Sequence, residues 1–177
     1  MQFAKDSFYM ALRERLGSLN PARTAIVNGA TRPAVIVAEN ELPSPASPLP
    51  DAFYIDWGSA RIVQNHAGTQ VLAALDCVIS YCTSGTTGSE VDRGRTLGTL
   101  GGELFSICQP PQTRKQDFTR IPSVDLGTSI FWTLPELSEI GSNLSGALTS
   151  GGDAGRHARL ERRALLTVFF FFEVTLL

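Results

Sequence analysis

Residues that commonly carry catalysis or bind metals are scarce in this chain. It has two histidines and three cysteines among 177 residues. None of them falls in a His-x-x-His, Glu-x-x-His or Cys-x-x-Cys spacing, so neither a metal site nor a cofactor is expected. An odd number of cysteines favours reduced thiols in a cytosolic setting. Cys77 and Cys82 lie on one expected strand with side chains on opposite faces, so they do not readily bridge.

Charge and long apolar runs are scarce as well. Charged residues make up 18% of the chain and the net charge is −2, so the sequence has no electrostatic footprint of nucleic-acid binding. The C-terminal apolar run holds about 14 residues where a membrane helix needs about 20, and Glu173 interrupts it. The polar N-terminus leads into an amphipathic pattern, so no signal peptide is expected. Neither a nucleic-acid partner nor a membrane partner is therefore predicted.

The C-terminal run at 164–177 is the most informative feature that is present. Its residues alternate with a period of two, which predicts a strand. Both faces are largely apolar, which is typical of a strand covered on both sides. One cover is the core of the domain, and the other is a helix layer or another subunit, which favours an assembly protein. One face holds Leu166, Val168, Phe170, Phe172, Val174 and Leu176, and the other holds Leu165, Thr167, Phe169 and Phe171.

The rest of the chain predicts an α+β fold, a mostly antiparallel sheet with two main helices packed on one face. Asn28-Gly29 between apolar runs predicts a hairpin, and the second helix has a buried stripe from Leu97 to Ile107. A single domain over 1–177 is expected, with a Pro-rich loop at about 40–52 and a Gly/Ser-rich loop at 138–158. The expected helices are 3–16 and 91–108, and the expected strands are 24–27, 33–38, 53–57, 71–82, 128–133 and 164–177.

One loop resembles a known phosphate-binding motif. Tyr81-Cys-Thr-Ser-Gly-Thr-Thr-Gly88 is similar to the phosphate loop of acyl-adenylate-forming enzymes, which continues with Pro-Lys-Gly. Here Ser89-Glu90-Val91 stands in that place, so the cation is missing. Ordinary turn chemistry explains such a loop, and weak anion binding before the next helix stays open. A small phosphate- or nucleotide-binding enzyme that uses Ser84–Gly88 is therefore the alternative to a structural protein.

The carboxylates do not favour that enzyme alternative. Asp51, Asp56, Asp76 and Glu103 are scattered, and nothing in their spacing pairs two of them as an acid and a base. No Gly-x-Ser-x-Gly elbow is present to support a catalytic triad. We therefore expect that the chain is not an enzyme.

Two basic clusters are candidate docking patches for an acidic partner surface. Arg156 to Arg163 is the larger and Arg114-Lys115 is the smaller, and for both the alternative is a solvated surface. Together with one apolar strand face they give the predicted interface residues, which are Phe169, Phe171, Arg156, Arg159, Arg162, Arg163, Arg114 and Lys115.

The order of elements resembles that of the tail terminator proteins of long-tailed bacteriophages, also called minor tail or tail-completion proteins. The N-terminal helix leads into Ile26-Val-Asn-Gly29 and Arg32-Pro-Ala-Val-Ile-Val-Ala38. Phe53-Tyr-Ile-Asp-Trp57 and the 75–81 strand then precede one long helix at 92–108. The strands Ile130-Phe-Trp132 and 166–176 close the chain. The loops at 42–50 and 138–158 are insertions relative to compact members.

This resemblance implies a structural virion protein with no catalysis. It implies a homo-oligomer, a hexameric ring that caps the head-proximal end of the tail tube, stops tube polymerisation and offers a joint to the neck. The implied partners are the tail tube protein and a neck or head-tail connector protein. The implied location is the virion tail or neck, and the host cytoplasm during assembly. A neighbouring neck or head-closure role is the alternative within the same class.

Overall fold

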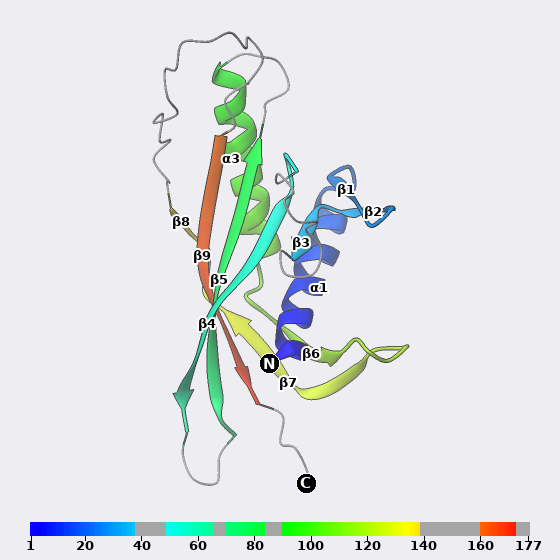
Figure 1. The fold of residues 1–177 in the computed structure, drawn as a ribbon, viewed down its shortest axis with the longest axis vertical. Coiled ribbons are helices and arrows are strands. Elements are labelled where there is room, and N and C mark those ends of the chain that lie inside the picture. Colours follow the sequence, from blue (N-terminus) through cyan, green and yellow to red (C-terminus); the bar gives the residue numbers. More distant parts are fainter. Residues whose placement is uncertain (38–48, 66–69, 84–89, 139–159, 173–177) are drawn as a thin grey trace.

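The computed structural model describes residues 1–37, 49–65, 70–83, 90–138 and 160–172. It is an α+β fold, as predicted, in which a long twisted sheet stands beside two helices (Figure 1). The chain runs through α1 (Gln2–Leu19), β1 (Thr24–Val27), β2 (Ala30–Pro33), β3 (Val35–Val37), β4 (Phe53–Gln64), β5 (Leu72–Thr83), α3 (Glu90–Ile107), β6 (Gln112–Asp117), β7 (Val124–Trp132), β8 (Glu136–Ser138) and β9 (Leu160–Phe171).

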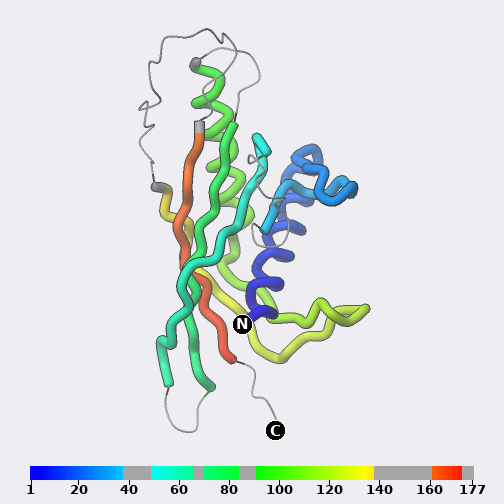
Figure 2. The backbone as a smooth tube through the Cα atoms, in the orientation of Figure 1, coloured from blue at the N-terminus to red at the C-terminus, as the bar shows by residue number. Residues whose placement is uncertain are grey.

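The main sheet has the strand order β3-β4-β5-β9-β7-β6, and β8 pairs with β9 beside this path. All of its pairs are antiparallel except β3 with β4. The central pair β5–β9 is in register along its whole length, from Leu72 opposite Phe171 to Thr83 opposite Leu160. The backbone trace shows β4, β5 and β9 as a tall blade, with β6 and β7 running off to one side (Figure 2). This blade is the rigid frame of the molecule.

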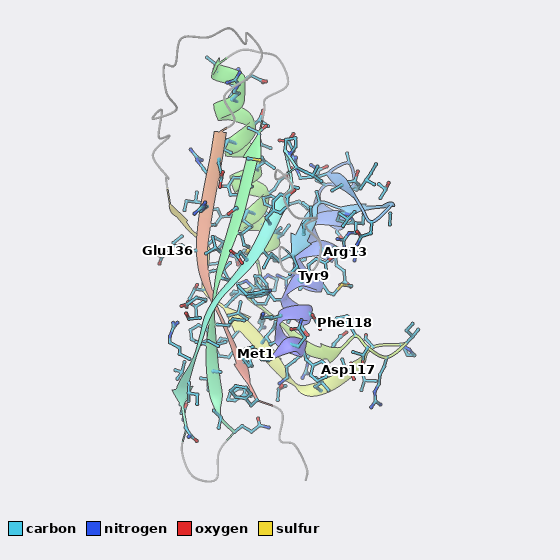
Figure 3. The ribbon with its side chains drawn as sticks, viewed as in Figure 1. Met1, Tyr9, Arg13, Asp117, Phe118 and Glu136 are labelled. Carbon is cyan, nitrogen blue, oxygen red and sulfur yellow. The ribbon has the colours of Figure 1, made fainter. Side chains whose placement is uncertain are left out.

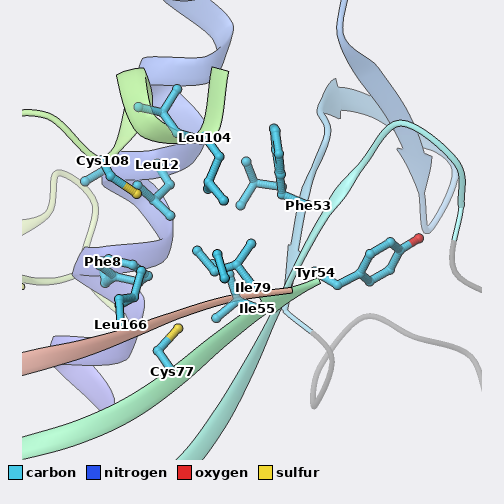
Figure 4. Close-up of a cluster of buried hydrophobic side chains, with 14 of the residues drawn as sticks. Phe8, Leu12, Phe53, Tyr54, Ile55, Cys77, Ile79, Leu104, Cys108 and Leu166 are labelled. Atoms are coloured by element: carbon cyan, nitrogen blue, oxygen red, sulfur yellow. The ribbon is translucent and has the colours of Figure 1, made fainter. Parts of the chain in front are cut away.

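Both helices pack on one face of the sheet, which we call the inner face, and the opposite face is the outer face. In α1, buried Phe8, Leu12 and Leu16 recur every four residues and so form one helical stripe. Phe8 lies edge-on to Trp57 and Trp132, with ring centroids 5.6 Å and 5.0 Å away. Figure 4 shows this core between helix and sheet. Such edge-to-face contacts favour one packing arrangement over others.

The second helix begins and ends close to the predicted bounds. Its buried stripe is the predicted one, Leu97, Leu100, Leu104 and Ile107. Gly101 faces the sheet so closely that an added Cβ would lie 3.2 Å from the hydroxyl of Tyr81. A larger residue at this position would require the Tyr81 side chain or the helix to shift by a few tenths of an ångström, so glycine, a poor helix former, permits this close approach.

The predicted hairpin forms, but its second arm ends early. Asn28 and Gly29 have φ of 51° and 80°, as a two-residue type I′ turn requires. The second arm stops at Pro33, whereas the prediction continued it to residue 38. Proline has no N–H to donate, and the next residue, Ala34, accepts from Phe53 N–H at 2.8 Å. The apolar run that follows is therefore β3, which pairs in parallel with β4 in the other sheet.

Strand β9 confirms the alternation predicted for the C-terminal run but corrects its coverage. The inner-face residues Ala164, Leu166, Val168 and Phe170 are buried, whereas Leu165 on the outer face is 47% exposed. Phe172, predicted to share the buried face, is exposed because it lies just past the end of the strand. Of the same prediction, Val174 and Leu176 lie outside the described residues. In the described chain no helix layer covers the outer face.

Strands β6 and β8 were not predicted, and β4 is longer than expected. Strand β6 is polar and has no apolar alternation, so its sequence carries no strand signal. Side chains of α1 hold its outer edge. Gln116 N–H donates to Ser7 Oγ at 2.9 Å, and Arg15 donates to Gln112 O at 2.9 Å and to Pro110 O at 2.8 Å. The strand thus depends on a helix more than 90 residues earlier in the chain.

Candidate assembly surface

The outer face of the sheet presents a row of apolar side chains to solvent. Phe131 of β7 lies opposite Phe169 of β9, and their rings stack with centroids 5.2 Å apart and planes 11° from parallel. Phe131 is 38% exposed and Phe169 is half-buried. We call the following set the outer apolar patch: Val78 of β5, Leu165, Phe169 and Phe171 of β9, and Phe131 of β7. Because side chains two apart on a strand share a face, the patch follows directly from the register.

A row of polar side chains crosses this patch and divides it into two apolar areas. Asp76 of β5 lies opposite Thr167 of β9, whose hydroxyl donates to Asp76 Oδ1 at 3.4 Å. Arg61 of β4 forms an ion pair with the same carboxylate. Val78 and Leu165 lie on one side of this row and Phe169 lies on the other. A partner must therefore match two apolar areas and the polar row between them, which supplies specificity.

The patch contains two of the predicted interface residues, Phe169 and Phe171. The backbone of Phe171 is also held in place, because Lys115 Nζ donates to Phe171 O. The lysine itself is only 1% exposed. This burial argues against the prediction of Lys115 as a docking residue, because its ammonium donates to a strand carbonyl. Its neighbour Arg114 is exposed and lies 3.9 Å from Asp125.

The two described arginines of the larger basic cluster, Arg162 and Arg163, lie on opposite faces of the sheet. Arg162 lies opposite Tyr81, on the inner face, whereas Arg163 lies opposite Ser80, on the outer face. Burial raises the pKa of Tyr81, and Arg162 partly offsets this rise. Arg163 pairs with Glu161 at 3.4 Å. The alternation of a strand separates these charges, and the predicted Arg156 and Arg159 lie outside the described residues.

Two of the carboxylates that could have served an enzyme, Glu103 and Asp76, have structural partners. Glu103 of α3 forms an ion pair with Arg23 and accepts from Asn20 Nδ2 at 2.7 Å, which ties α3 to the end of α1. Asp76 belongs to the polar row. The predicted phosphate loop at 84–88 lies outside the described residues. In the part of the chain that the structure covers, no three His, Cys, Asp or Glu side chains gather as a metal would need.

The rest of the described surface offers few other candidate sites. A shallow hollow lies along the C-terminal half of α1, lined by Glu14, Arg15, Ser18 and Leu19. No helix among the described residues is long and apolar enough to cross a membrane. The outer apolar patch is therefore the surface with the clearest chemical character. Phe131 was missing from the sequence-based list, although its place between two apolar residues of one strand, Ile130 and Trp132, was a signal that it faces away from them.

The buried thiols give a test of the inner core. Burial raises the pKa of Cys108 from its usual 9.0 to about 12, although Arg15 acts in the opposite direction. Burial, and then Cys108, raise the pKa of Cys77 well above its usual value. We expect neither thiol to react with iodoacetamide at pH 8 in the folded protein, and both to react in guanidinium. Fast labelling of either one without denaturant would contradict this packing.

The same pKa shift predicts a pH dependence of stability. The folded state favours the neutral thiol of Cys108, so its contribution is complete below pH 9 and is lost as the pH rises from 9 towards about 12. Denaturant titrations should show a smaller loss of stability over this range in a Cys108→Ala variant than in the parent chain. An identical loss in both proteins would show that the thiol does not carry it.

Comparisons with known proteins add a distant likeness. No family model matches the chain, and no curated protein matches it. A solved structure described as "Virion of native gene transfer agent (GTA) particle" is similar over 95% of this chain and 94% of the matched chain, with 13% identity and a TM-score of 0.40. Such a similarity does not decide function, so we base the function on the residues described above.

Proposed function

We propose that this chain is a structural protein of a phage-like virion, and specifically a ring-forming tail terminator. In this role it caps the head-proximal end of the tail tube, stops tube polymerisation and joins the tube to the neck. In this role the protein acts through its binding surfaces and catalyses no reaction. The observation that carries the proposal is the outer apolar patch, because exposed apolar areas on a sheet face, bordered by polar residues, mark an interaction site.

The sheet supports this role by holding the patch ready for a partner. The strands β5 and β9 pair over twelve residues each, so Val78 and Leu165 are fixed in place before any partner arrives. A preformed surface loses little conformational freedom on binding, and this leaves more of the contact energy for affinity. The element order resembles that of tail terminators, and this resemblance implies the kind of assembly, which is a closed ring of copies. The partners of that ring are the tail tube protein and a neck or connector protein.

The mass of the purified protein in solution tests the proposal. We expect light scattering to give six times the 19.1 kDa chain, either alone or after mixing with tail tube subunits, and negative-stain images to show rings. A protein that stays monomeric at all concentrations and does not respond to tube subunits would contradict it. Binding to neck proteins with no binding to tube ends would instead favour the neighbouring neck role.

A further inference from the structure

Most edges of the sheet are closed by the chain itself. Ser7 and Arg15 of α1 hold the outer edge of β6, and Lys115 caps the carbonyl of Phe171 at the end of β9. Such closures prevent unwanted strand pairing. Two of the remaining edges have no such closure among the described residues. These are the part of β4 beyond Ile55, where pairing with β3 ends, and the side of β8 that faces away from β9.

On β4 the backbone of Ile62 faces this open edge. Phe172 N–H donates to Val71 O, so the odd-numbered residues of β5 direct their backbone groups towards β9. Ala73 is one of these, and Ile62 lies opposite it. The N–H and C=O of Ile62 therefore point away from β5, into the open edge. Its side chain is 61% exposed and belongs to the inner face.

On β8 the backbone of Leu137 is placed in the same way. Thr133 N–H donates to Thr167 O at 3.0 Å, so the odd-numbered residues of β9 direct their backbone groups towards the β7 and β8 side. Leu137 lies opposite the even-numbered Ala164, and its N–H and C=O therefore point away from β9. Its side chain is 40% exposed, also on the inner-face side. Figure 3 labels its neighbour Glu136 on the side of the sheet away from α1.

We propose that β4 of one copy pairs with β8 of the next copy, with Ile62 opposite Leu137 of the neighbouring copy. This inference rests on the proposed function, because it supplies the contact between copies in the ring. The two residues would exchange a pair of backbone hydrogen bonds and would bury two exposed apolar side chains against each other. The occupant of each open edge is thus a second copy of this chain.

The strand directions agree with a ring. Strand β8 is antiparallel to β9, and β4 is parallel to β9 because both are antiparallel to β5. Copies that point the same way therefore bring β8 and β4 together as an antiparallel pair. Because two different edges meet, the contact is heterologous, and such contacts form closed rings or filaments, whereas a symmetric dimer needs one surface that pairs with itself.

The register also sets a stagger between copies. Ile62 lies opposite Ala73 of β5, and Ala73 lies opposite Phe170 of β9, so Ile62 and Phe170 are at the same height in the sheet. Leu137 is level with Ala164, six residues away from Phe170 along β9. At about 3.3 Å per residue this is an offset of about 20 Å from one copy to the next. Strands joined with a constant offset tilt relative to the axis of the closed assembly.

Two irregularities in β4 keep the pairing short. Its register with β5 shifts between Trp57 and Ala60 and again between Ile62 and Gln64. Bulges of this kind blunt an edge against indiscriminate pairing. The regular stretch that remains is three residues long, the same length as the pairing of β3 with β4. The edge is therefore suited to a short, specific partner strand.

Paired cysteines test the contact. In Ile62→Cys/Leu137→Cys, mild oxidation should link neighbouring copies and give a ladder of multimers on non-reducing gels. Each single variant serves as a control and should stop at weak dimers, because Cys77, Cys82 and Cys108 are buried. A ring mass without a ladder would overturn this contact and leave the proposed function standing. A protein that stays monomeric with and without tube subunits and gives no ladder would overturn both.

A proline substitution separates backbone pairing from side-chain packing. Ile62→Pro removes the outward N–H, which an edge position tolerates, whereas Ile62→Ala keeps it and removes most of the side chain. We expect the proline variant to associate about tenfold more weakly than the alanine variant, because one backbone hydrogen bond contributes about that factor. Equal association of the two variants would contradict strand pairing. If Ile62→Pro fails to fold, Leu137→Pro against Leu137→Ala makes the same comparison from the other strand.

Discussion

The Phe170→Asp variant should not fold. Phe170 is fully buried on the inner face, opposite Ala73 of β5. Truncating a buried phenylalanine costs about 3–5 kcal/mol, and an unpaired carboxylate in the same place adds several kcal/mol more. Domains of this size are stable by only about 5–15 kcal/mol. Circular dichroism should show little cooperative unfolding, and the variant should accumulate as aggregate.

A neighbouring substitution on the other face is the control for this result. Phe169→Asp changes the adjacent residue of the same strand, where the side chain is half-buried on the outer face. It should fold with a modest loss of stability, because its carboxylate reaches solvent. A soluble Phe170→Asp variant with a cooperative transition would show that this side of β9 is not core.

The separation of these two faces follows from sequence alone, because a period of two assigns alternate residues to opposite sides. What covers each face does not follow from it. The apolar outer face led to the expectation of a second cover, and in the described chain Phe131 and Leu165 remain exposed there. An apolar alternation indicates which residues are expected to be buried in the assembled protein. It does not indicate whether the same chain or another subunit buries them.

Local patterns also fail where a distant element makes a strand possible. The sequence predicts strand β3 as part of the second arm of the hairpin. In the structure the hairpin ends at Pro33, and Ala34 accepts from Phe53 N–H. Strand β6 has no apolar signal, and Ser7 and Arg15 of α1 hold its edge. Both depend on contacts between residues far apart in the chain. Propensity and alternation describe neighbours only, so such strands need the tertiary fold to define them.

The candidate site was predictable in the same limited way. Phe169 and Phe171 were predicted because alternation places them on one face of the strand. Lys115 was predicted to be exposed because a lysine in a polar stretch usually extends into solvent. Its burial depends on the carbonyl of Phe171, which comes from another strand. The proposed interface between copies was not predictable from the sequence, since the outward backbone groups of Ile62 and Leu137 follow only from the observed register.

Replacing both stacked rings of the outer face, as in Phe131→Ser/Phe169→Ser, should weaken partner binding and leave the fold intact. The rings contact each other and solvent, so their loss should lower monomer stability by only about 1 kcal/mol. Phe131 is 38% exposed and Phe169 is half-buried, so a partner can cover only the remaining area of each ring. Complete burial of a phenylalanine contributes about 1.5–3 kcal/mol, so the remaining area contributes about 0.5–1 kcal/mol for each ring. The double variant should therefore bind its partner about tenfold more weakly.

The matched control is Phe105→Ser, since Phe105 of α3 is 37% exposed, almost as much as Phe131. It lies on a helix away from the outer face and should change neither the mass nor the partner binding. Thermal unfolding must be measured for all variants, so that lost assembly is separated from lost fold. If the Phe105 variant and the double variant lose assembly to the same degree, general surface hydrophobicity drives association. If the double variant still forms full rings that bind tube subunits as tightly as the parent chain does, the outer apolar patch is not the assembly surface.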